Sequence, residues 1–185
     1  MTKGWRQETS AAAVAASIVA TTLAPNATES AVANGDTRTI SFSNDHTGEE
    51  GSFTYMVNGV YDQAALDKLN WFMRDWRLNE PTRMDPRLFD IVWEVYRESG
   101  SHLPINVFSA YRSPQTNAML ARMSGGVATN SMHLQGKAAD IHLPGRSLAS
   151  LHRAALHLGR GGVGYYPESD FVHVDTGRVR QWQYG

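Results

Sequence analysis

Short segments that favour β-strands and amphipathic segments that favour helices follow one another in this chain without a regular strand–helix–strand rhythm. Two β-prone runs, residues 39–43 and 52–57, come first and enclose a polar stretch that contains glycine, which predicts a β-hairpin. Apolar residues at helical spacing then predict a helix from Asp62 to about Arg77 and a second helix that ends at residues 99–100. Because a doubly wound parallel sheet needs regular crossover helices, this order favours an α+β domain.

The second half of the chain is equally irregular. Residues 105–109 are a short apolar run that leads into Ser113 and Pro114, which suit the N-cap and the first position of a helix. That helix is predicted to run through Met123 to a glycine pair at 125–126. We expect a single domain in which helices flank a small antiparallel sheet. The remaining predicted elements are a strand at 138–143, a helix at 147–158, and strands at 163–166 and 171–176.

The chain has 185 residues, enough to bury a core in one domain, and it contains no cysteine. Disulfides, thiolate metal sites and cysteine nucleophiles are therefore excluded, and any metal ion would need imidazole and carboxylate ligands. The formal net charge of -1 argues against nucleic acid or an anionic membrane as the main partner. The seven histidines are thus the residues to examine for a metal site.

The N-terminal segment differs in composition from the rest of the chain. Two basic residues precede an uncharged, Ala-rich run at 9–28, and the small residues 31–33 follow it. This order predicts a secretory signal peptide over residues 1–33 and a folded domain over residues 34–185 of an exported protein. A disordered tail and an uncleaved anchor are the alternatives, although the run is weakly apolar for a transmembrane helix.

Two histidine-containing segments have the pattern of a metal site. His133 lies in a predicted loop and precedes Asp140, on a predicted strand, by seven residues across a glycine turn. His173 and Asp175 share one face of a second predicted strand, because side chains alternate with period two. If the two strands are neighbours, Asp140 and His173 converge. Two imidazoles and one carboxylate would then hold Zn²⁺ and leave a fourth position for water, as catalytic zinc sites do.

Three segments, in order along the chain, resemble one known family. They are Ser-Ala-Tyr-Arg-Ser at 109–113, Ser-Met-His-Leu-Gln-Gly-Lys-Ala-Ala-Asp-Ile at 131–141, and Gly-Val-Gly-Tyr-Tyr-Pro at 162–167 with Phe-Val-His-Val-Asp-Thr-Gly at 171–177. Together they resemble the M15-type zinc peptidases, in particular the murein endopeptidase K-like branch. The resemblance is strong over residues 102–182. It implies the hedgehog/D-Ala-D-Ala-peptidase fold and an exported, periplasmic setting.

The resemblance makes the two histidines and the aspartate of this pattern the zinc ligands. It also makes Arg112 a residue that holds a substrate carboxylate or carbonyl near the metal. Arginine suits this role, because its planar guanidinium binds a carboxylate through two charge-assisted hydrogen bonds and stabilises a developing oxyanion. Tyr111 and His142 are further candidate substrate contacts. His142 lies two residues beyond Asp140 and so faces the same side of the strand, where support of a metal ligand and a purely structural role are the alternatives.

A general base is needed to take a proton from the attacking water and pass it to the leaving amine. In the wider family a glutamate three residues before the last ligand has this role, and that position is Asp170 here. Residues three apart face opposite sides of a strand, so Asp170 reaches the metal only from a turn before a late strand start. Asp175 and Glu168 are the alternative bases, and Asp175 could instead orient His173.

These residues predict a hydrolase that cleaves an amide bond with the help of Zn²⁺, and the resemblance adds the substrate, the peptide cross-links of bacterial peptidoglycan. We expect a monomeric murein endopeptidase with no nucleic-acid partner and no stable membrane insertion after processing. One alternative is a D,D- or L,D-carboxypeptidase or dipeptidase of the same family, which would need a groove closed at one end. Another is a noncatalytic, zinc-containing module that binds the cell wall and lacks a base.

Overall fold

The computed structural model describes residues 37–123 and 127–184. The predicted signal peptide at 1–33 lies outside these residues, and so does the glycine pair at 125–126 that was predicted to end a helix. Among the described helices, none has the length and apolar character that crossing a membrane requires.

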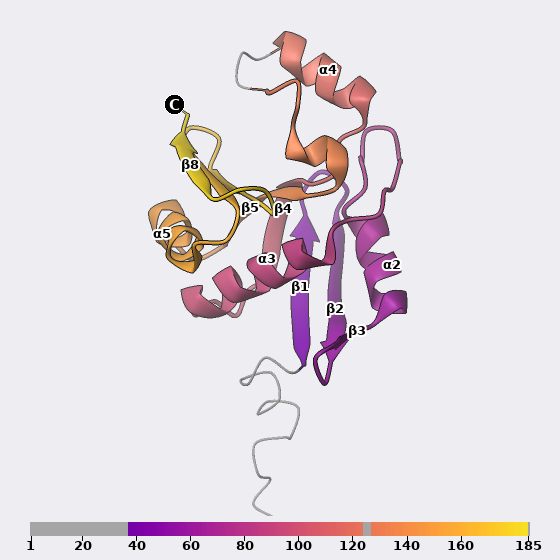
Figure 1. Ribbon diagram of the computed structural model, residues 1–185, viewed down its shortest axis with the longest axis vertical. Coiled ribbons are helices and arrows are strands. Elements are labelled where there is room, and N and C mark those ends of the chain that lie inside the picture. Colours follow the sequence, from indigo (N-terminus) through magenta and orange to yellow (C-terminus); the bar gives the residue numbers. More distant parts are fainter. Residues whose placement is uncertain (1–36, 124–126, 185) are drawn as a thin grey trace, which may run out of the picture.

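Eight strands of the described residues form one sheet. In chain order they are β1 (Arg38–Asn44), β2 (Glu49–Val57), β3 (Val60–Tyr61), β4 (Ile105–Ser109), β5 (Ala138–His142), β6 (Gly162–Tyr166), β7 (Phe171–Asp175) and β8 (Arg180–Gln183). Their order in the sheet is β3-β2-β1-β4-β5-β7-β6-β8. Neighbours are antiparallel except for two parallel pairs, β1 with β4 and β6 with β8. The long hairpin β1–β2 thus forms one end of the sheet and the C-terminal strands form the other (Figure 1).

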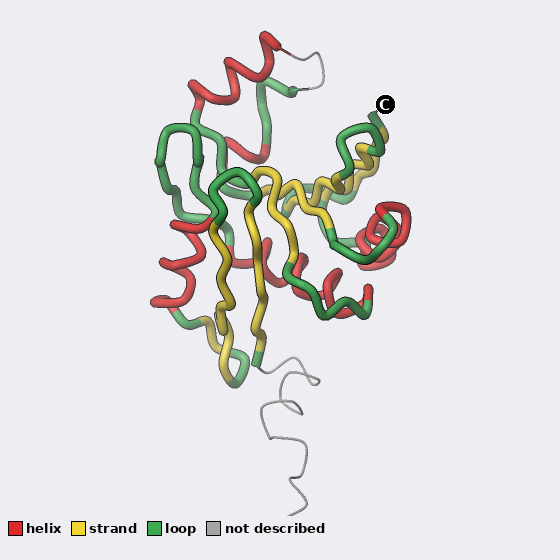
Figure 2. Tube along the Cα trace, turned by 180° about the vertical axis from the view of Figure 1, so that it is seen from behind, coloured by secondary structure: helices red, strands yellow, loops and turns green. Residues whose placement is uncertain are grey.

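Four α-helices and one 3₁₀ helix of the described residues accompany the sheet. They are α2 (Gln63–Phe72), α3 (Pro86–Ser99), α4 (Pro114–Met123), η1 (Met132–Gln135) and α5 (Leu148–Leu158). In Figure 1, α3 lies across the sheet and contacts α5, whereas α4 stands at the top of the view. Seen from behind, β1 and β2 lie in front of α3, so this helix covers the opposite face of the sheet (Figure 2). The prediction of a single α+β domain is confirmed.

Hydrogen bonds at the helix ends confirm several predicted boundaries. The Asp62 carboxylate accepts from two backbone N–H groups in the first turn of α2, and the Ser147 hydroxyl accepts from the N–H of Ser150 in α5. Gly100 ends α3 in the left-handed conformation, with φ of 62°. These local signals act within one turn of the chain, which is why the sequence alone revealed them.

Helix α2 is shorter than predicted, because it ends at Phe72 and not near Arg77. Beyond this point the backbone N–H of Asp75 donates to the carbonyl oxygen of Glu80 at 2.8 Å and closes a turn. Asp75 is 1% exposed, and its carboxylate accepts hydrogen bonds from the backbone N–H of Arg77 and from Ser113. Tertiary contacts therefore override the helical periodicity of this segment.

The sheet is larger than predicted and contains parallel pairs. The predictions missed β3, which has two residues, and β8, whose sequence Arg-Gln-Trp-Gln holds a single apolar residue. Both strands lie at the edges of the sheet, where no continuous apolar run is needed. An apolar pattern therefore could not reveal them, whereas the other predicted strands are confirmed.

The apolar core lies between the sheet and the helices that cover it. Phe42 on β1, Phe89 on α3 and Val172 on β7 have no exposed surface, and Leu151 on α5 is 1% exposed. Each such side chain contributes about 1.5–3 kcal/mol through burial. This core joins the N-terminal hairpin to the strands that carry the predicted metal ligands.

A buried carboxylate ties the hairpin to α3. Asp90 on α3 is 6% exposed and accepts hydrogen bonds from Arg38 Nη1 at 2.6 Å and from the Tyr55 hydroxyl at 3.2 Å. The Tyr61 hydroxyl on β3 also donates to this carboxylate. Burial, together with the hydrogen bond and charge of Asp90, raises the pKa of Tyr61 to about 12, so the phenol stays protonated.

Removal of this carboxylate should destabilise the domain. Asp90→Ala is expected to lower the free energy of unfolding by about 2–3 kcal/mol, because an arginine and two tyrosine hydroxyls lose a charged acceptor. Urea denaturation followed by circular dichroism measures the change. Glu98→Ala, at an exposed position of the same helix, is the matched control and should change stability by less than about 0.5 kcal/mol. Equal effects of the two substitutions would contradict this role of Asp90.

Candidate metal centre

Local sequence holds His133 in η1. The Ser131 hydroxyl caps this helix by accepting from the N–H of His133 at 3.3 Å, and Gly136 ends it with φ of 64°. A Cβ atom on Gly136 would lie 2.8 Å from the carbonyl oxygen of Arg83, so glycine is required there. The His133 ring is buried, and its Nδ1 donates to the carbonyl oxygen of Ala110 at 2.5 Å. The lone pair of Nε2 is therefore directed towards β5.

Asp140 and His173 face each other across neighbouring strands. They are direct partners in the antiparallel pairing of β5 with β7, and Asp140 Oδ1 lies 2.8 Å from His173 Nδ1. The same oxygen lies 3.2 Å from His133 Nε2, which is itself 3.2 Å from His173 Nδ1. The prediction that Asp140 and His173 converge from adjacent strands is confirmed.

Asp175 orients His173 from the far side of the ring. The two residues share a face of β7, as predicted, and His173 Nε2 donates to Asp175 Oδ2 at 3.1 Å. Asp175 is fully buried and also accepts hydrogen bonds from Arg180 and from two backbone N–H groups. Burial alone would raise the pKa of Asp175, but the hydrogen bonds from His173 and Arg180 hold it below its ordinary range. The carboxylate is therefore ionised and committed to these partners.

Three atoms that can only accept hydrogen bonds lie close together in this arrangement: two imidazole nitrogens and one carboxylate oxygen. The outer nitrogen of each imidazole donates to a protein acceptor, so the inner nitrogens of His133 and His173 are acceptors, like Oδ1 of Asp140. Three acceptors within 3.2 Å repel one another unless a proton or a metal ion lies between them.

The residues present fit a zinc ion. Among the described residues, His133, Asp140 and His173 form the group of histidine and acidic side chains that could hold a metal ion. Two imidazoles and one carboxylate suit a catalytic zinc site with an open fourth position. Their mutual distances of 2.8–3.2 Å approach the edge of about 3.3 Å in a tetrahedron around Zn²⁺.

Arg112 joins the metal centre to the end of β4. Its Nη2 donates to the second oxygen of Asp140, Oδ2, at 2.6 Å, and its Nε donates to the Ser109 hydroxyl at 2.9 Å. Burial alone would raise the pKa of Asp140, but the two neighbouring histidines and Arg112 hold it well below its ordinary range. Nη1 of Arg112 has no protein partner within the part of the chain that the structure describes.

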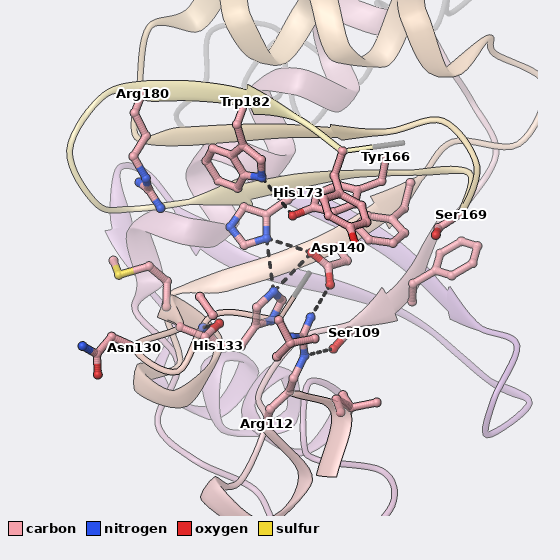
Figure 3. Close-up of a pocket in the computed structure, with 18 of the residues that line it drawn as sticks. Ser109, Arg112, Asn130, His133, Asp140, Tyr166, Ser169, His173, Arg180 and Trp182 are labelled. Carbon is pink, nitrogen blue, oxygen red and sulfur yellow. Dashed lines mark hydrogen bonds and ion pairs between the residues drawn. The ribbon is translucent and has the colours of Figure 1, made fainter. Parts of the chain in front are cut away.

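These residues line a cavity of about 550 Å³, a volume typical of ligand-binding sites. Figure 3 shows the three candidate ligands turned towards one another, with Arg112 on one side and Trp182 on the other. The larger apolar and aromatic side chains of the wall are Phe108, Leu120, Val127, Met132, Tyr166, Phe171, Trp182 and Tyr184. The three candidate ligands and Arg112 thus lie in a cavity whose wall also carries many large apolar side chains.

None of the three candidate bases lines this cavity. Asp170 lies in the turn before β7, as predicted, with φ of 54°, and its carboxylate lies 3.2 Å from His142 Nδ1. Glu168 is exposed in the same turn, and both oxygens of Asp175 are occupied by the partners given above. Among the described residues of the lining, Asp140 supplies the only carboxylate.

The two candidate substrate contacts are also absent from the cavity lining. His142 Nδ1 donates to the carbonyl oxygen of Asp170 at 3.0 Å, and its ring meets the edge of Phe108, which does line the cavity. Tyr111 is half-buried against the core, and its backbone N–H donates to the carbonyl oxygen of Met73 at 3.0 Å. The structure thus places His142 beside the wall and Tyr111 against the core.

Several residues of the lining were not predicted as site residues, among them Arg77, Arg180 and Trp182. The Trp182 ring packs on His173, with centroids 5.1 Å apart, and its Nε1 donates to the Tyr166 hydroxyl at 2.8 Å. Period-two spacing of Arg180 and Trp182 was the available signal, since it places both on one face of a strand. Arg77 lies in a turn outside the motifs, where no local pattern marks it.

Comparison with known proteins extends these observations. The family model described as peptidoglycan L,D-endopeptidase MepK matches residues 32–182. The peptidoglycan L,D-endopeptidase MepK of Escherichia coli K12 is 43% identical over 145 residues, which are 78% of this chain and 80% of that protein. The probable MepK of Haemophilus influenzae is 42% identical over 160 residues, 86% of each chain. The zinc D-Ala-D-Ala carboxypeptidase of Streptomyces albus G is 30% identical over 133 residues, 68% of this chain and 48% of that protein.

An α+β fold with a His-Asp-His centre in an open cavity defines, together with these similarities, a metallopeptidase of the M15 type. More narrowly, the chain belongs to the MepK family of peptidoglycan L,D-endopeptidases. The predicted family is confirmed, and the matched segment contains every candidate site residue named above.

Metal binding should depend on pH through His173. Burial works to lower the pKa of His173, but its hydrogen bonds with Asp140 and Asp175 outweigh burial and raise the pKa above the ordinary 6.5. His133 stays neutral, because burial lowers its pKa. A proton on His173 Nδ1 therefore competes with the metal, and the apparent Zn²⁺ affinity should rise about tenfold per pH unit below the pKa and then level off.

Competition with a chromophoric chelator over a pH series measures this affinity. Asp175→Asn replaces one of the two carboxylates that raise the pKa of His173, so the affinity of this variant should level off at a lower pH. An affinity independent of pH between about 5.5 and 6.5 would show that no proton leaves His173 on binding.

Proposed function

We propose that this chain is a zinc-dependent peptidoglycan endopeptidase that hydrolyses peptide cross-links of the bacterial cell wall. The observation that carries the proposal is the convergence of His133, Asp140 and His173 in an open cavity. The identity of 43% to the Escherichia coli L,D-endopeptidase, over 80% of that protein, supports the same substrate and bond type. The ligand set and the similarity to a zinc D-Ala-D-Ala carboxypeptidase support Zn²⁺ as the metal.

Arg112 is suited to stabilise charge at the scissile carbonyl. Zn²⁺ held by the three ligands would supply a Lewis acid for that carbonyl and for the attacking water. Arg112 lies beside this position, since its Nη2 binds the outer oxygen of Asp140, and Ser109 holds its Nε. The plane of the guanidinium is thus fixed at two points. Its Nη1 is left to donate to the oxygen on which negative charge develops.

Aromatic side chains surround the site and limit the access of water. Phe108 packs on Phe171 with ring centroids 6.0 Å apart, and Tyr166 stacks on Phe171 at 4.5 Å. Burial raises the pKa of Tyr166, and its hydroxyl oxygen accepts from Trp182, so the phenol is a neutral donor. Such a wall lowers the local dielectric constant and strengthens the interaction of Arg112 with a developing negative charge.

For the proton transfer we propose Asp170, which lies three residues before His173. Its two neighbours in sequence, Ser169 and Phe171, both line the cavity. The carboxylate pairs with His142 in the structure, so proton transfer requires the side chain to change rotamer. Because this side chain is 63% exposed, the change disturbs no core packing.

This assignment is tested by Asp170→Asn. The substitution should lower kcat by about 10²–10⁴-fold, because an amide cannot accept the proton, and should leave KM and zinc content nearly unchanged. Steady-state kinetics on a purified cross-linked peptide measure the effect. Glu168→Gln, in the same turn, is the matched control and should retain activity. Wild-type kcat in Asp170→Asn would assign the proton transfer to another group.

Export supports the same function. Peptidoglycan lies outside the cytoplasmic membrane, and residues 1–33 have the order of charges and apolar residues that a signal peptide has. A chain without cysteine also folds in an oxidising compartment without the formation of wrong disulfides. We therefore propose the periplasm as the place of action. A monomeric state stays a prediction.

A carboxypeptidase of the same family is the second candidate, because the zinc enzyme of Streptomyces albus G is 30% identical over 133 residues. The products distinguish the two functions. An endopeptidase separates two cross-linked stem peptides, whereas a carboxypeptidase releases a terminal residue and leaves the cross-link intact. Mass spectrometry of the digest therefore names the bond. A noncatalytic module would bind peptidoglycan and yield no product.

The function is tested by digestion of purified peptidoglycan. Wild-type protein with Zn²⁺ should release separated stem peptides, and a chelator should abolish this release until Zn²⁺ is restored. His133→Ala should reduce the rate by at least about 10³-fold, because it removes a metal ligand. His157→Ala, at an exposed position of α5, is the matched control. Full activity in the presence of the chelator and in His133→Ala would refute a zinc hydrolase.

A further inference from the structure

Three arginines line the cavity, and two of them are neutralised by buried carboxylates. Arg112 Nη2 lies 2.6 Å from Asp140, and Arg180 Nη2 lies 2.6 Å from Asp175. The third is Arg77, whose guanidinium forms no hydrogen bond or ion pair within residues 37–123 and 127–184. Among the described residues, no carboxylate contacts the positive charge of Arg77 in this cavity.

Arg77 is nevertheless held in place by a stack of planar groups. Its guanidinium lies over the Trp76 ring, 4.2 Å from the centroid. The other partner of this indole is the His46 ring in the turn between β1 and β2, at 4.5 Å and an interplanar angle of 15°. Stacking restricts the rotamers of the arginine but leaves the N–H groups at its edge available for a ligand.

The backbone of Arg77 is anchored to the segment that carries Arg112. Asp75 Oδ1 accepts from the backbone N–H of Arg77 at 3.1 Å, and Asp75 Oδ2 accepts from the N–H and hydroxyl of Ser113 at 2.9 and 2.7 Å. Asp75 attracts the charge of Arg77, but both of its oxygens already have these partners. One buried carboxylate thus sets the distance between the turn at residue 77 and the start of α4.

Arg77 and Arg112 face the same space. Burial, and then the positive charge of Arg112, work to lower the pKa of Arg77, while Asp75 opposes them. The charge of Arg77, which no carboxylate of the described residues pairs with, favours an anionic ligand, and Zn²⁺ at the three ligands would strengthen this preference. Arg112 already binds a carboxylate oxygen of the metal centre. Arg77 is therefore the residue with a complete set of donors for a group of the substrate.

We propose that Arg77 binds a free carboxylate of the peptide substrate and thereby selects acidic cross-linked peptides over their amidated forms. This inference rests on the proposed function and deepens it. The planar guanidinium matches a carboxylate with two parallel N–H···O bonds, whereas a carboxamide offers one oxygen and no charge. Arg77 is neither one of the three candidate metal ligands nor a candidate base, so its contact should affect binding of the substrate more than the chemical step.

The inference is tested with synthetic cross-linked peptides in which each free carboxylate is replaced in turn by a carboxamide. Wild-type protein should lose about 10- to 100-fold in kcat/KM on one of these amidated peptides. Arg77→Gln should lose a similar factor on the acidic peptide, through KM and not kcat, and should no longer distinguish the two. Arg77→Lys keeps the charge without the planar fork and should give an intermediate loss.

Arg153→Gln, at an exposed position of α5 outside the cavity, is the matched control and should behave as wild type. Circular dichroism and zinc content verify that each variant is folded and loaded. The inference is overturned if wild-type protein cleaves acidic and amidated peptides equally, or if Arg77→Gln retains the discrimination. If wild-type protein cleaves no peptide and no peptidoglycan, the proposed function fails. Isothermal calorimetry then measures the affinities of wild-type protein and Arg77→Gln for the acidic and amidated peptides. The inference is overturned if wild-type protein binds both peptides equally, or if Arg77→Gln still distinguishes them.

Discussion

The mutual repulsion of three acceptor atoms is the constraint on which the rest of the site depends. Two imidazole nitrogens and one carboxylate oxygen lie within 3.2 Å of one another, and each of the three groups is held from its outer side. The partners are the carbonyl oxygen of Ala110, the carboxylate of Asp175 and the guanidinium of Arg112. These partners fix the tautomers and leave the inner lone pairs for a cation. These contacts form only when β4 and β7 keep their register relative to β5, so the site depends on the pairing of these strands.

Buried carboxylates also organise the charges of the cavity. Asp140 and Asp175 neutralise one arginine each, whereas Asp75 uses its oxygens for the backbone of one turn and for Ser113. Because Asp75 is occupied in this way, Arg77 keeps its side-chain donors for a ligand. The same buried group thus holds the turn that follows helix α2, and it leaves the guanidinium of Arg77 without a hydrogen bond to a carboxylate of the described residues. The course of this turn and the proposed specificity therefore depend on the same carboxylate.

Local signals of the sequence predicted most of the fold. Asp62, Ser147 and Gly100 mark helix ends through contacts within one turn, and the alternation of strand residues placed His173 and Asp175 on one face. The edge strands β3 and β8 escaped prediction, because a strand that is paired on one side needs no apolar run. The predicted end of α2 was wrong for a different reason. The contact of Asp75 with Ser113, which is distant in sequence, overrides the helical period of the segment.

The sequence by itself determined which side chains could hold a metal ion. In a chain without cysteine, two histidines and one aspartate on turns and strands at matching spacing form a candidate site for catalytic zinc. Only the tertiary structure decided how the remaining charges are used. Asp170 pairs with His142 across 28 residues, and Asp75 binds Ser113 across 38 residues. Such pairings form where two elements pack together, and no periodicity or cap within either segment records the partner.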